Sequence, residues 1–497
     1  MSKVTIVGAG LTGLCLSIMF TKRGYDVTVI EKNTWPGGIY ASKVEKKYLF
    51  NSGLEFYFPH SWLLSFFGDI GEDINQYLKF ETLDHKYKTF IENPSPTEPY
   101  NVLTLNENLD SLRKMILHLE GNLDGYENFY KKLAPLSEEF TSTFLNGHET
   151  EIFEKFLYKH GFTGTLSSFL RSYFKNPNCL AFLESFGLFF GDDADKLPSY
   201  YVFLLFDIIQ KPLYKPVNGF TEIAEKLYFL SKKLGTNFWF GQEIENCIIE
   251  NSKVHQLKIK DSPSLLTQLA LNKENGFEIP FQENLITCDT IIHTGDYESF
   301  EKNVLQDSQY KNYDEKFWQK LENTPSYCTF LIGLKKEIPD LADHCFIPGK
   351  PLIGDAISFE SSIYFTATPA QEGTLPTLKI LSYQSSNGIG SKEDNDKLLL
   401  DCIKRISTVT NINLSENISQ YVQFDPEDLK NQFLYARKSP YGMRHNIKDP
   451  VQLLATVNHK LHNLFYATNS NYPGGNGLLS IVRAKSLSSW LVDDKTA

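Results

Sequence analysis

The feature that most constrains this chain is a glycine-rich turn between two short apolar segments near its beginning. Residues 3–7 (K-V-T-I-V) predict a buried strand, residues 11–23 have the composition of a helix, and residues 26–30 (D-V-T-V-I) predict a second strand. The turn before the helix has the spacing G-x-G-x-x-G, and Glu31 closes the second strand. This order of elements is the β-α-β unit that binds a dinucleotide, so we predict an α/β fold with a Rossmann-type domain.

Each glycine of the turn has a separate physical task. Gly8 permits the tight bend, Gly10 lets the backbone approach a pyrophosphate, and Gly13 lets the helix pack closely on the strand. The N-terminus of the helix stabilises the phosphate charge, and Glu31 is placed to accept hydrogen bonds from ribose hydroxyls. In this unit the predicted cofactor-binding residues are Gly8, Gly10, Leu11, Thr12, Gly13, Glu31 and Lys32.

The charge balance of the chain excludes one class of partner. Lys and Arg total 49 and Asp and Glu total 60 in 497 residues, which gives a formal net charge of −11. A nucleic-acid-binding protein shows a basic face, so we predict no nucleic-acid partner. Aromatic residues make up 14% of the chain, with 37 Phe and 26 Tyr, which indicates a large apolar cavity or surface in addition to a core.

The cysteines and the apolar runs bear on cellular location. Seven scattered Cys without a C-x-x-C pair fit a reducing compartment, and we predict no metal site. No run of 18 apolar residues occurs and the N-terminus does not resemble a signal peptide. We therefore expect a cytoplasmic protein without a transmembrane helix, with peripheral contact to a membrane left open.

The rest of the chain predicts a discontinuous arrangement of domains. Helical composition dominates residues 105–160 and 165–230, whereas residues 325–385 alternate apolar and polar positions as strands do. Residues 464–492 read again as a strand, a glycine-rich turn and a helix. We therefore predict a cofactor domain in separate pieces, with an α+β substrate domain inserted between them. The expected pieces are 1–75, 215–300 and 445–497 for the cofactor domain, and 76–214 and 301–444 for the substrate domain.

The residues after the second strand indicate which dinucleotide is bound. The pattern E-K-x-x-x-x-G-G, which ends at Gly37 and Gly38, resembles the extended fingerprint of FAD-binding amine-oxidase-like enzymes, whose paired glycines approach the FAD phosphates. Those enzymes usually carry Arg next, where this chain has Ile39, and Lys32 and Lys43 are candidate substitutes. A second G-x-G-x-x-G after a strand is absent from the sequence, so we expect FAD and not NAD(P) as the main redox cofactor.

Further segments, in the right order along the chain, resemble one branch of those enzymes. Residues 191–200 resemble the G-x-x-P-x-x-x-P-S-x-Y segment of carotenoid (phytoene and diapophytoene) desaturases, and residues 215–227 resemble their P-x-G-G turn and helix. Residues 463–475 resemble their L-Y-F-A-G…P-G-G segment. The other matching segments are 49–53, 237–254, 424–428, 439–442 and 484–485. By this resemblance the chain is identified as a member of the phytoene desaturase-like branch of the FAD-dependent amine-oxidase superfamily.

That resemblance implies a fold, a cofactor and a class of substrate. The expected fold is a discontinuous, GR2-like FAD domain with an inserted substrate domain, the cofactor is non-covalent FAD, and the substrate is an apolar polyprenoid or polyene lipid that undergoes carotenoid-type desaturation. The alternatives are flavin-dependent saturation, isomerisation or oxygenation, an amine-oxidase-like reaction on a polar substrate, and a non-enzymatic flavin-binding lipid carrier. The resemblance adds to the predicted cofactor site Ile244, Gly474, Gly475, Asn476 and Leu478.

The catalytic residues are less determined than the cofactor site. Arg444 and His445 are the candidates, because in the family this stretch runs close to cofactor and substrate. For Asp192, Asp193 and Asp195 the alternatives are a general acid or base and an exposed acidic turn, and we favour the turn. For His293, at the end of a strand, the alternatives are a side chain that faces the cofactor and a hydrogen-bonded core residue, and we favour the core residue. The chain departs from the family pattern near the expected flavin at Asn51, Asn218, Thr468, Tyr472, Asn476 and Leu478.

An apolar substrate has to leave a bilayer without crossing water, which predicts a docking surface. The two candidate surfaces are the aromatic residues 56–67 and the apolar run 200–209. The second is favoured because Lys211 and Lys215 follow it and would face lipid headgroups. The alternative is that both runs are interior helices.

Overall fold

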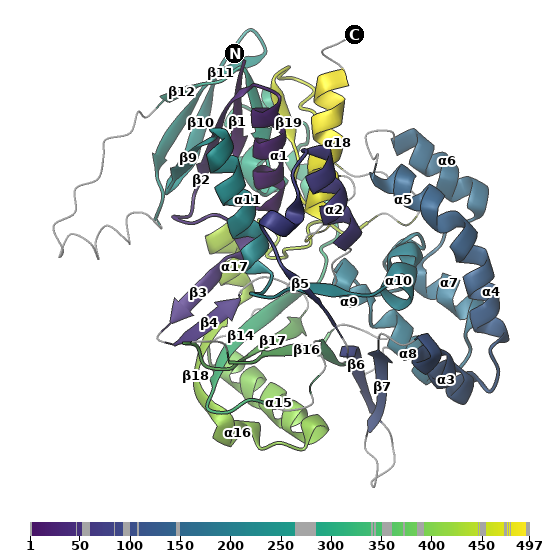
Figure 1. The fold of residues 1–497 in the computed structure, drawn as a ribbon. Helices are drawn as coiled ribbons and strands as arrows, with labels where there is room; N and C mark the ends of the chain where they lie inside the picture. Colours follow the sequence, from purple (N-terminus) through teal and green to yellow (C-terminus); the bar gives the residue numbers. More distant parts are fainter. Residues whose placement is uncertain are drawn as a thin grey trace.

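Five strands from distant parts of the chain form one parallel sheet in the computed structural model (Figure 1). The strand order is β19-β13-β1-β2-β9. The strands are β1 (Lys3–Val7), β2 (Asp26–Glu31), β9 (Asn237–Phe240), β13 (Thr290–His293) and β19 (Leu464–Tyr466). At the end of β1, Val7 pairs with Ile30 on one side and His293 on the other. Because the sheet is extended in both directions from β1, the carboxyl ends of β1, β2 and β13 enclose a crevice of the kind in which dinucleotides bind.

The structure describes most of the chain, in a series of segments. They are residues 2–45, 47–51, 60–83, 85–92, 100–106, 109–145, 150–263, 285–338, 341, 344–349, 360–370, 373–384, 392–445, 447, 454–471, 475, 477 and 479–493.

Different layers cover the two faces of the parallel sheet. One face packs against helices α1 (Leu11–Lys22), α11 (Thr221–Leu234) and α18 (Leu479–Asp493). The other packs against an antiparallel sheet of β10 (Gln242–Glu250), β11 (Lys253–Asp261) and β12 (Leu285–Thr287). Neighbouring residues of one strand therefore enter different cores: Val29 faces the helices, whereas Ile30 faces the antiparallel sheet. Apolar runs such as residues 3–7 follow from this burial on both faces.

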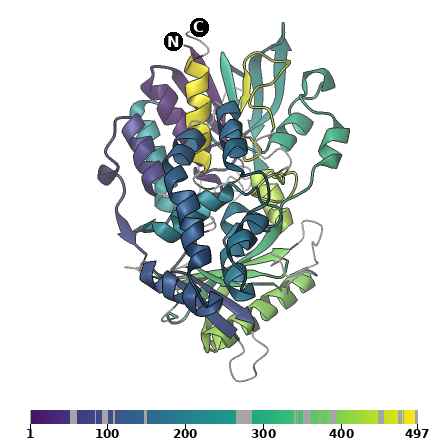
Figure 2. The same cartoon turned by 90° about the vertical axis from the view of Figure 1, so that its right-hand side faces the viewer.

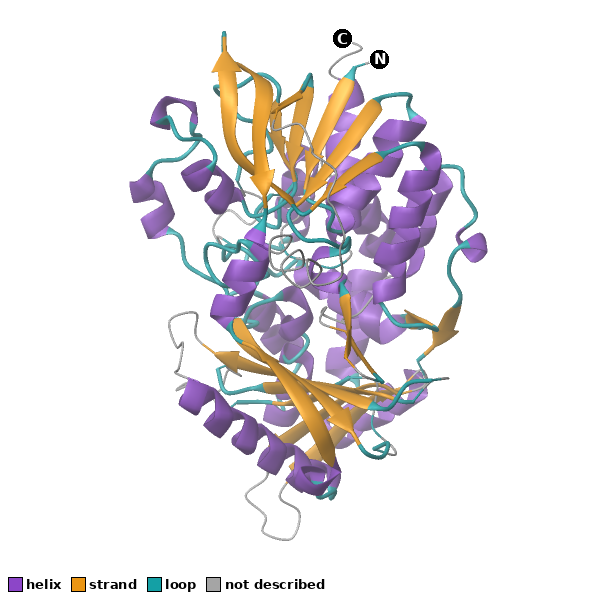
Figure 3. Cartoon of the chain, turned by 90° about the vertical axis from the view of Figure 1, so that its left-hand side faces the viewer, coloured by secondary structure: helices purple, strands orange, loops and turns teal. Residues whose placement is uncertain are grey.

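A second, mixed sheet of seven strands lies at the other end of the molecule (Figures 1 and 3). Its order is β18-β14-β17-β16-β15-β6-β7, and all pairs are antiparallel except β15 with β6. The strands are β6 (His85–Glu92), β7 (Tyr100–Asn106), β14 (Ser326–Leu334), β15 (Cys345–Ile347), β16 (Ile363–Thr368), β17 (Thr377–Gln384) and β18 (Ile418–Phe424). Helix α15 (Lys392–Thr410) covers one face of this sheet, and α16 (Leu414–Asn417) follows it.

A group of helices fills the side of the molecule between the two sheets (Figure 2). They are α3 (Leu109–Glu120), α4 (Asp124–Leu133), α5 (Ser137–Leu145), α6 (Thr150–His160), α7 (Leu166–Tyr173), α8 (Pro177–Glu184), α9 (Gly187–Phe190) and α10 (Tyr201–Gln210). The remaining elements are α2 (His60–Asp69), α13 (Tyr297–Asn303), α14 (Glu315–Lys320), α17 (Pro426–Phe433), the strand pairs β3 (Ser42–Glu45) with β4 (Tyr48–Asn51) and β5 (Phe80–Thr82) with β8 (Tyr214–Pro216), and the short 3₁₀ turns η1 (Gly38–Tyr40), η2 (Ile74–Gln76), η3 (Ala134–Leu136) and η4 (Ser308–Tyr310).

The α/β fold and its Rossmann-type unit are confirmed, whereas one sequence interpretation is wrong. The sheet expected in residues 325–385 is present as strands β14 to β17, and all nine residues of β14 are buried because both faces of this strand are covered. The favoured membrane-docking run is the interior helix α10, which is buried from Tyr201 to Ile209 and whose Asp207 pairs with Lys211 at 2.8 Å. The predicted domain boundaries stay a prediction.

The other candidate docking run is described only in part. Residues 56–59 lie outside the described segments, and in α2 the side chains of Trp62, Leu63, Phe66 and Phe67 are buried, while Leu64 is exposed. Within the described residues, no helix has both the length and the apolar character needed to cross a membrane.

Candidate functional site

A cavity of about 350 Å³ opens at the carboxyl ends of β1, β2 and β13. The predicted residues that line it are Gly8, Gly10, Leu11, Thr12, Glu31, Lys32, Gly37, Gly38 and Ile244. Segments that are far away in sequence complete the wall with Gln242, His293, Thr294, Gly295, Tyr435, Asn469 and Arg483, among others. We call this space the nucleotide cavity, because it occupies the crevice in which a dinucleotide binds in folds of this kind.

The glycine turn has the geometry that its spacing predicts. Gly8 has a φ of +111° and donates its N–H to the carbonyl of Ile30 at 2.8 Å. A Cβ at Gly13 would lie 2.0 Å from the carbonyl oxygen of Gly8, so close packing of α1 on the turn requires glycine there. A Cβ at Gly10 would meet no atom within 4 Å. Gly10 therefore leaves space free for a ligand, while Gly13 serves the packing of the helix.

Glu31 is a buried carboxylate held by neighbouring N–H groups. One oxygen accepts the backbone N–H of Ala9 at 2.7 Å, and the other accepts the backbone and side-chain N–H groups of Asn33 at 2.8 and 3.0 Å. Burial raises the pKa of Glu31, and these hydrogen bonds oppose the rise. A carboxylate has about four lone-pair positions, so it retains the capacity to accept a hydrogen bond from a ligand hydroxyl.

The paired glycines pack backbone against backbone on the glycine turn. Gly37 and Gly38 have φ values of +107° and +58°, and Gly37 donates its N–H to the carbonyl of Ala9 at 2.8 Å. A Cβ at Gly38 would approach the Cα of Gly10 to 3.3 Å. The pair lets the segment before η1 close one side of the cavity, and Ile39 lines it where the family usually has Arg.

A buried arginine from the C-terminal helix enters the wall of the nucleotide cavity. Arg483, in α18, is 3% exposed, and its Nη atoms donate to the carbonyl of Gly475 at 2.8 Å and to the hydroxyl of Thr12 at 3.3 Å. Burial lowers the pKa of Arg483 to about 9. The site therefore holds a cation next to the glycine turn, which an anionic ligand would stabilise.

Sequence reasoning missed Arg483. The signal was present, since a charged residue interrupts the apolar run Ile481-Val482 just before the matching residues Ala484 and Lys485. Tyr435, which also lines the cavity, stands in a loop after α17 and carries no comparable signal.

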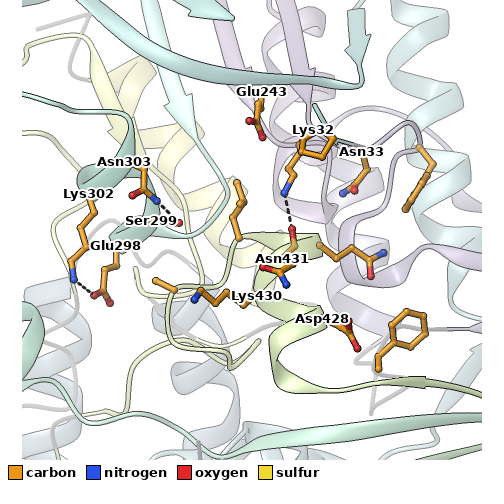
Figure 4. A pocket seen from close by; sticks show the side chains of 16 residues that line it. Lys32, Asn33, Glu243, Glu298, Ser299, Lys302, Asn303, Asp428, Lys430 and Asn431 are labelled. Carbon is orange, nitrogen blue, oxygen red and sulfur yellow. Dashed lines mark hydrogen bonds and ion pairs between the residues drawn. The ribbon is translucent and has the colours of Figure 1, made fainter. Parts of the chain in front are cut away.

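A second cavity, of about 900 Å³, adjoins the nucleotide cavity (Figure 4). The two share Lys32, Asn33, Glu243, Ser299, Asn303, Gln432 and Leu434. Lys32 points towards Asn431, and its Nζ donates to the carbonyl of Asn431 at 2.7 Å. Lys302 is held by Glu298 at 2.7 Å on the opposite wall. The second cavity is thus a polar vestibule. It adjoins the nucleotide cavity on the side where Glu31 lies.

Arg444 is placed in an ion pair away from both cavities. Its Nε and Nη2 donate to the two carboxylate oxygens of Asp192 at 2.6 and 3.0 Å, and its Nη1 donates to Glu322 at 2.9 Å. Burial lowers the pKa of Arg444, but the two carboxylates raise it well above its usual value overall. Asp192 is 1% exposed, so the interpretation of this residue as part of an exposed acidic turn is wrong, because Arg444, 252 residues later, covers it.

His445 lies next to this pair and contacts a tyrosine of α10. Its Nε2 is 3.0 Å from the hydroxyl of Tyr201. Neither Arg444 nor His445 lines the nucleotide cavity, and their catalytic role stays a prediction.

The C-terminal glycine segment is described only in part. Gly474, Asn476 and Leu478 lie outside the described residues. Gly475 is described, with its carbonyl accepting from Arg483. The hydroxyl of Thr468, where the family usually has Gly, donates to Asn471 at 2.9 Å within its own turn. Among the described residues, no group of three or more His, Cys, Asp and Glu is arranged to hold a metal ion.

Comparisons with known proteins agree with this geometry. The pattern of an NAD(P)-binding Rossmann-like domain matches residues 6–70. A 1-hydroxycarotenoid 3,4-desaturase of a Flavobacterium species is 23% identical over 98% of both chains. A 4,4'-diapophytoene desaturase of Staphylococcus aureus is 22% identical over 99% of both chains. Among solved structures, cyclohexylamine oxidase of Brevibacterium oxydans superposes with a TM-score of 0.59 at 11% identity, over 100% of this chain and 99% of the oxidase.

The resemblance seen in the motifs thus extends from one end of the chain to the other. The chain has curated homologues among the carotenoid and diapophytoene desaturases, and it shares its fold with an amine oxidase over its whole length.

Proposed function

We propose that this protein is an FAD-dependent oxidoreductase that acts on an apolar polyprenoid or polyene lipid, with carotenoid-type desaturation as its reaction. The observation that carries the proposal is the nucleotide cavity, which brings a glycine turn, a buried carboxylate and a buried arginine together in a chain similar to desaturases along its full length.

The residues of the cavity fit the polar parts of FAD. The space above Gly10 would admit the pyrophosphate, the N-terminus of α1 and Arg483 would stabilise its charge, and Glu31 would accept hydrogen bonds from the ribose. These groups come from three segments, which are the glycine turn with α1, the end of β2, and α18, and they form a largely preformed site.

An aromatic layer between the helices and the seven-stranded sheet supports an apolar substrate. Tyr87 contacts Phe186 with ring centroids 4.5 Å apart, and the hydroxyls of Tyr383 and Tyr441 are 3.2 Å apart. A Cβ at Gly191 would lie 2.3 Å from the ring of Tyr441, so Gly191 lets this tyrosine pack on the helical side. Side chains of this kind offer large apolar area with few polar contacts, which suits a hydrocarbon chain.

The chemistry of the reaction would come mainly from the cofactor, since bound FAD accepts a hydride from carbon. The protein's own residues would bind and orient. The ion pair of Arg444 with Asp192 would hold the segment that carries His445 against the helices. A proton would be shared in the hydrogen bond between the hydroxyl of Tyr201 and Nε2 of His445, which are 3.0 Å apart. The aromatic layer would exclude water from the reacting carbons.

Flavin content tests the cofactor half of the proposal. The purified protein, heated in acid, is expected to release FAD near one equivalent, and a colourless supernatant would contradict the proposal. Gly10→Val should abolish FAD binding, because the added methyl groups fill the free space of the cavity. Gly68→Val is the matched control, since Gly68 is exposed and also has nothing within 4 Å of its Cβ, but lies in α2, outside the cavity.

The substrate half is tested by lipid analysis. Mass spectrometry of lipids from cells with and without the protein should show a polyene product that is lighter than its precursor by multiples of two hydrogen atoms. Products that gain two hydrogens or an oxygen would replace desaturation by saturation or oxygenation. An unchanged lipid profile with turnover of an amine would favour the polar-substrate alternative.

A further inference from the structure

The side chain of His293 lies at the end of β13 in the wall of the nucleotide cavity. Its Nε2 is 3.0 Å from the carbonyl oxygen of Asp296. A carbonyl oxygen only accepts, so Nε2 carries the hydrogen and donates. The other ring nitrogen, Nδ1, is therefore an acceptor with a lone pair.

Packing fixes the orientation of the His293 ring, and burial keeps the ring neutral. His293 is 7% exposed and its ring lies on that of Phe300, with centroids 4.3 Å apart. A Cβ at Gly295 would approach Cε1 of His293 to 2.9 Å, so the glycine makes room for the ring. Burial lowers the pKa of His293 to about 4, which keeps the imidazole neutral at physiological pH.

The acceptor Nδ1 is buried and has no hydrogen-bond partner among the residues that the structure describes. The neighbouring hydroxyl of Thr294 already donates its hydrogen to the carbonyls of Val7 and Gly8, at 3.0 and 3.2 Å. A buried acceptor without a donor costs free energy, and such atoms in a binding cavity are commonly completed by a ligand.

The chemistry of an acceptor limits which ligand group can complete it. Phosphate oxygens at neutral pH also accept, so they do not bond to Nδ1. The donors on a flavin dinucleotide are the ribose and ribitol hydroxyls, the adenine amino group and the N–H of the flavin ring. Of these, the hydroxyls and the amino group belong to the polar half of the molecule that the glycine turn and Glu31 are placed to hold.

We propose that Nδ1 of His293 accepts a hydrogen bond from a hydroxyl or amino group of the bound flavin dinucleotide. His293 is then a cofactor-binding residue on the β13 side of the crevice, opposite Glu31 on the β2 side. The inference rests on the proposed binding of FAD.

Nitrogen-15 NMR of the FAD-loaded protein reads this bond directly. The protein is labelled in its histidine imidazoles, and the signals of His293 are assigned among the 11 histidines by their loss in His293→Phe. The expected Nδ1 resonance is that of an acceptor in a hydrogen bond, moved upfield from the position of a free imidazole acceptor. A free-acceptor resonance in protein that carries FAD overturns the inference and leaves the proposed cofactor intact, whereas a protein that binds no FAD overturns both.

Affinity supplies the second readout. His293→Phe should raise the Kd for FAD about tenfold, because one buried hydrogen bond is lost. His293→Gln should recover most of the affinity, since its amide offers an N–H to Asp296 and an oxygen in place of Nδ1. His344→Phe is the control: this imidazole is also buried and bonds to Tyr364 at 2.8 Å, but it lies outside the cavity. An equal loss of affinity in the control, or no recovery with Gln, overturns the assignment.

Discussion

Arg444 and Arg483 differ in the groups that accept their hydrogen bonds. Arg444 is held by the carboxylates of Asp192 and Glu322, and its pKa is raised. Arg483 donates to two neutral oxygens, those of Gly475 and Thr12, and its pKa is lowered to about 9 by burial. Only Arg483 lines the nucleotide cavity.

The difference separates a structural cation from a binding cation. A charge already matched by carboxylates has little to gain from a further anion, whereas a charge whose pKa is lowered by burial gains from an anionic ligand in the same cavity. Proximity to a family motif pointed to Arg444, while burial in the wall of a cavity points to Arg483.

Removing Arg444 should give the largest effect, and it should fall on stability. Arg444→Met leaves the carboxylate of Asp192 buried and lowers the free energy of unfolding by about 3 kcal/mol, measured by chemical denaturation. The double variant Asp192→Asn with Arg444→Met should regain part of the loss. A loss of FAD affinity with unchanged stability would break the comparison and return Arg444 to the binding site.

Removing Arg483 should act on the cofactor instead. Arg483→Met is expected to raise the Kd for FAD about 100-fold, or about 2.7 kcal/mol, because a buried charge-assisted contact to phosphate is lost. Arg483→Lys keeps the charge without the planar fork and should lie between. Flavin fluorescence titration measures both, and wild-type affinity in the Met variant would sink the assignment.

Glu301 is an acidic counterpart of Arg483, because burial shifts its pKa towards the neutral form as well. Glu301 is fully buried and accepts from the backbone N–H groups of Asn312 and Tyr313 and from the hydroxyl of Tyr466. Burial raises the pKa of Glu301 from 4.5 to about 7, against these hydrogen bonds. Between pH 4.5 and 7 the folded state therefore binds more protons than the unfolded state, so stability falls as the pH rises and the loss is complete above pH 7.

The measurement is the free energy of unfolding at pH 5 and pH 8. The wild type should lose about 2 kcal/mol relative to Glu301→Gln over this range, because the variant has no group to titrate. The same pH dependence of stability in the wild type and in Glu301→Gln would contradict this prediction. It would show that the folded protein stabilises the Glu301 carboxylate as well as water does.

The smallest effect should come from Lys32, a half-buried cation at the edge of the cavity. Burial lowers its pKa, and its Nζ contacts the carbonyl of Asn431. Lys32→Met is expected to raise the Kd for FAD two- to fivefold, with the difference shrinking at high salt, since solvent screens a partly exposed charge. A rise in Kd as large as that of Arg483→Met would show that solvent exposure does not determine how much each cation contributes to FAD binding.

The sequence predicts the glycine-turn side of the site because its parts are local. Gly8 to Glu31 span one β-α-β unit, and the backbone itself supplies most of the contacts. The Arg483 side depends on pairings over hundreds of residues, such as that of Arg483 with Thr12, and no spacing rule encodes them.

Burial was the other quantity that the sequence did not settle. The apolar run of α10 is equally suited to a membrane surface and to an interior, and only the surrounding helices decide for the interior. Asp192 reads as a surface residue until Arg444 is placed over it.

The order of strands in the parallel sheet has a consequence for folding during synthesis. β13 pairs with β19, and Arg483 follows in α18, so this edge of the sheet and one wall of the cavity are synthesised well after the glycine turn. At ~5–20 residues per second, synthesis of residues 294–463 between β13 and β19 takes roughly 9–34 s, during which β13 has one unpaired edge. The glycine turn is synthesised before Arg483, so the nucleotide cavity is complete only when β19 and α18 have joined the sheet, and full binding of the cofactor waits for that step.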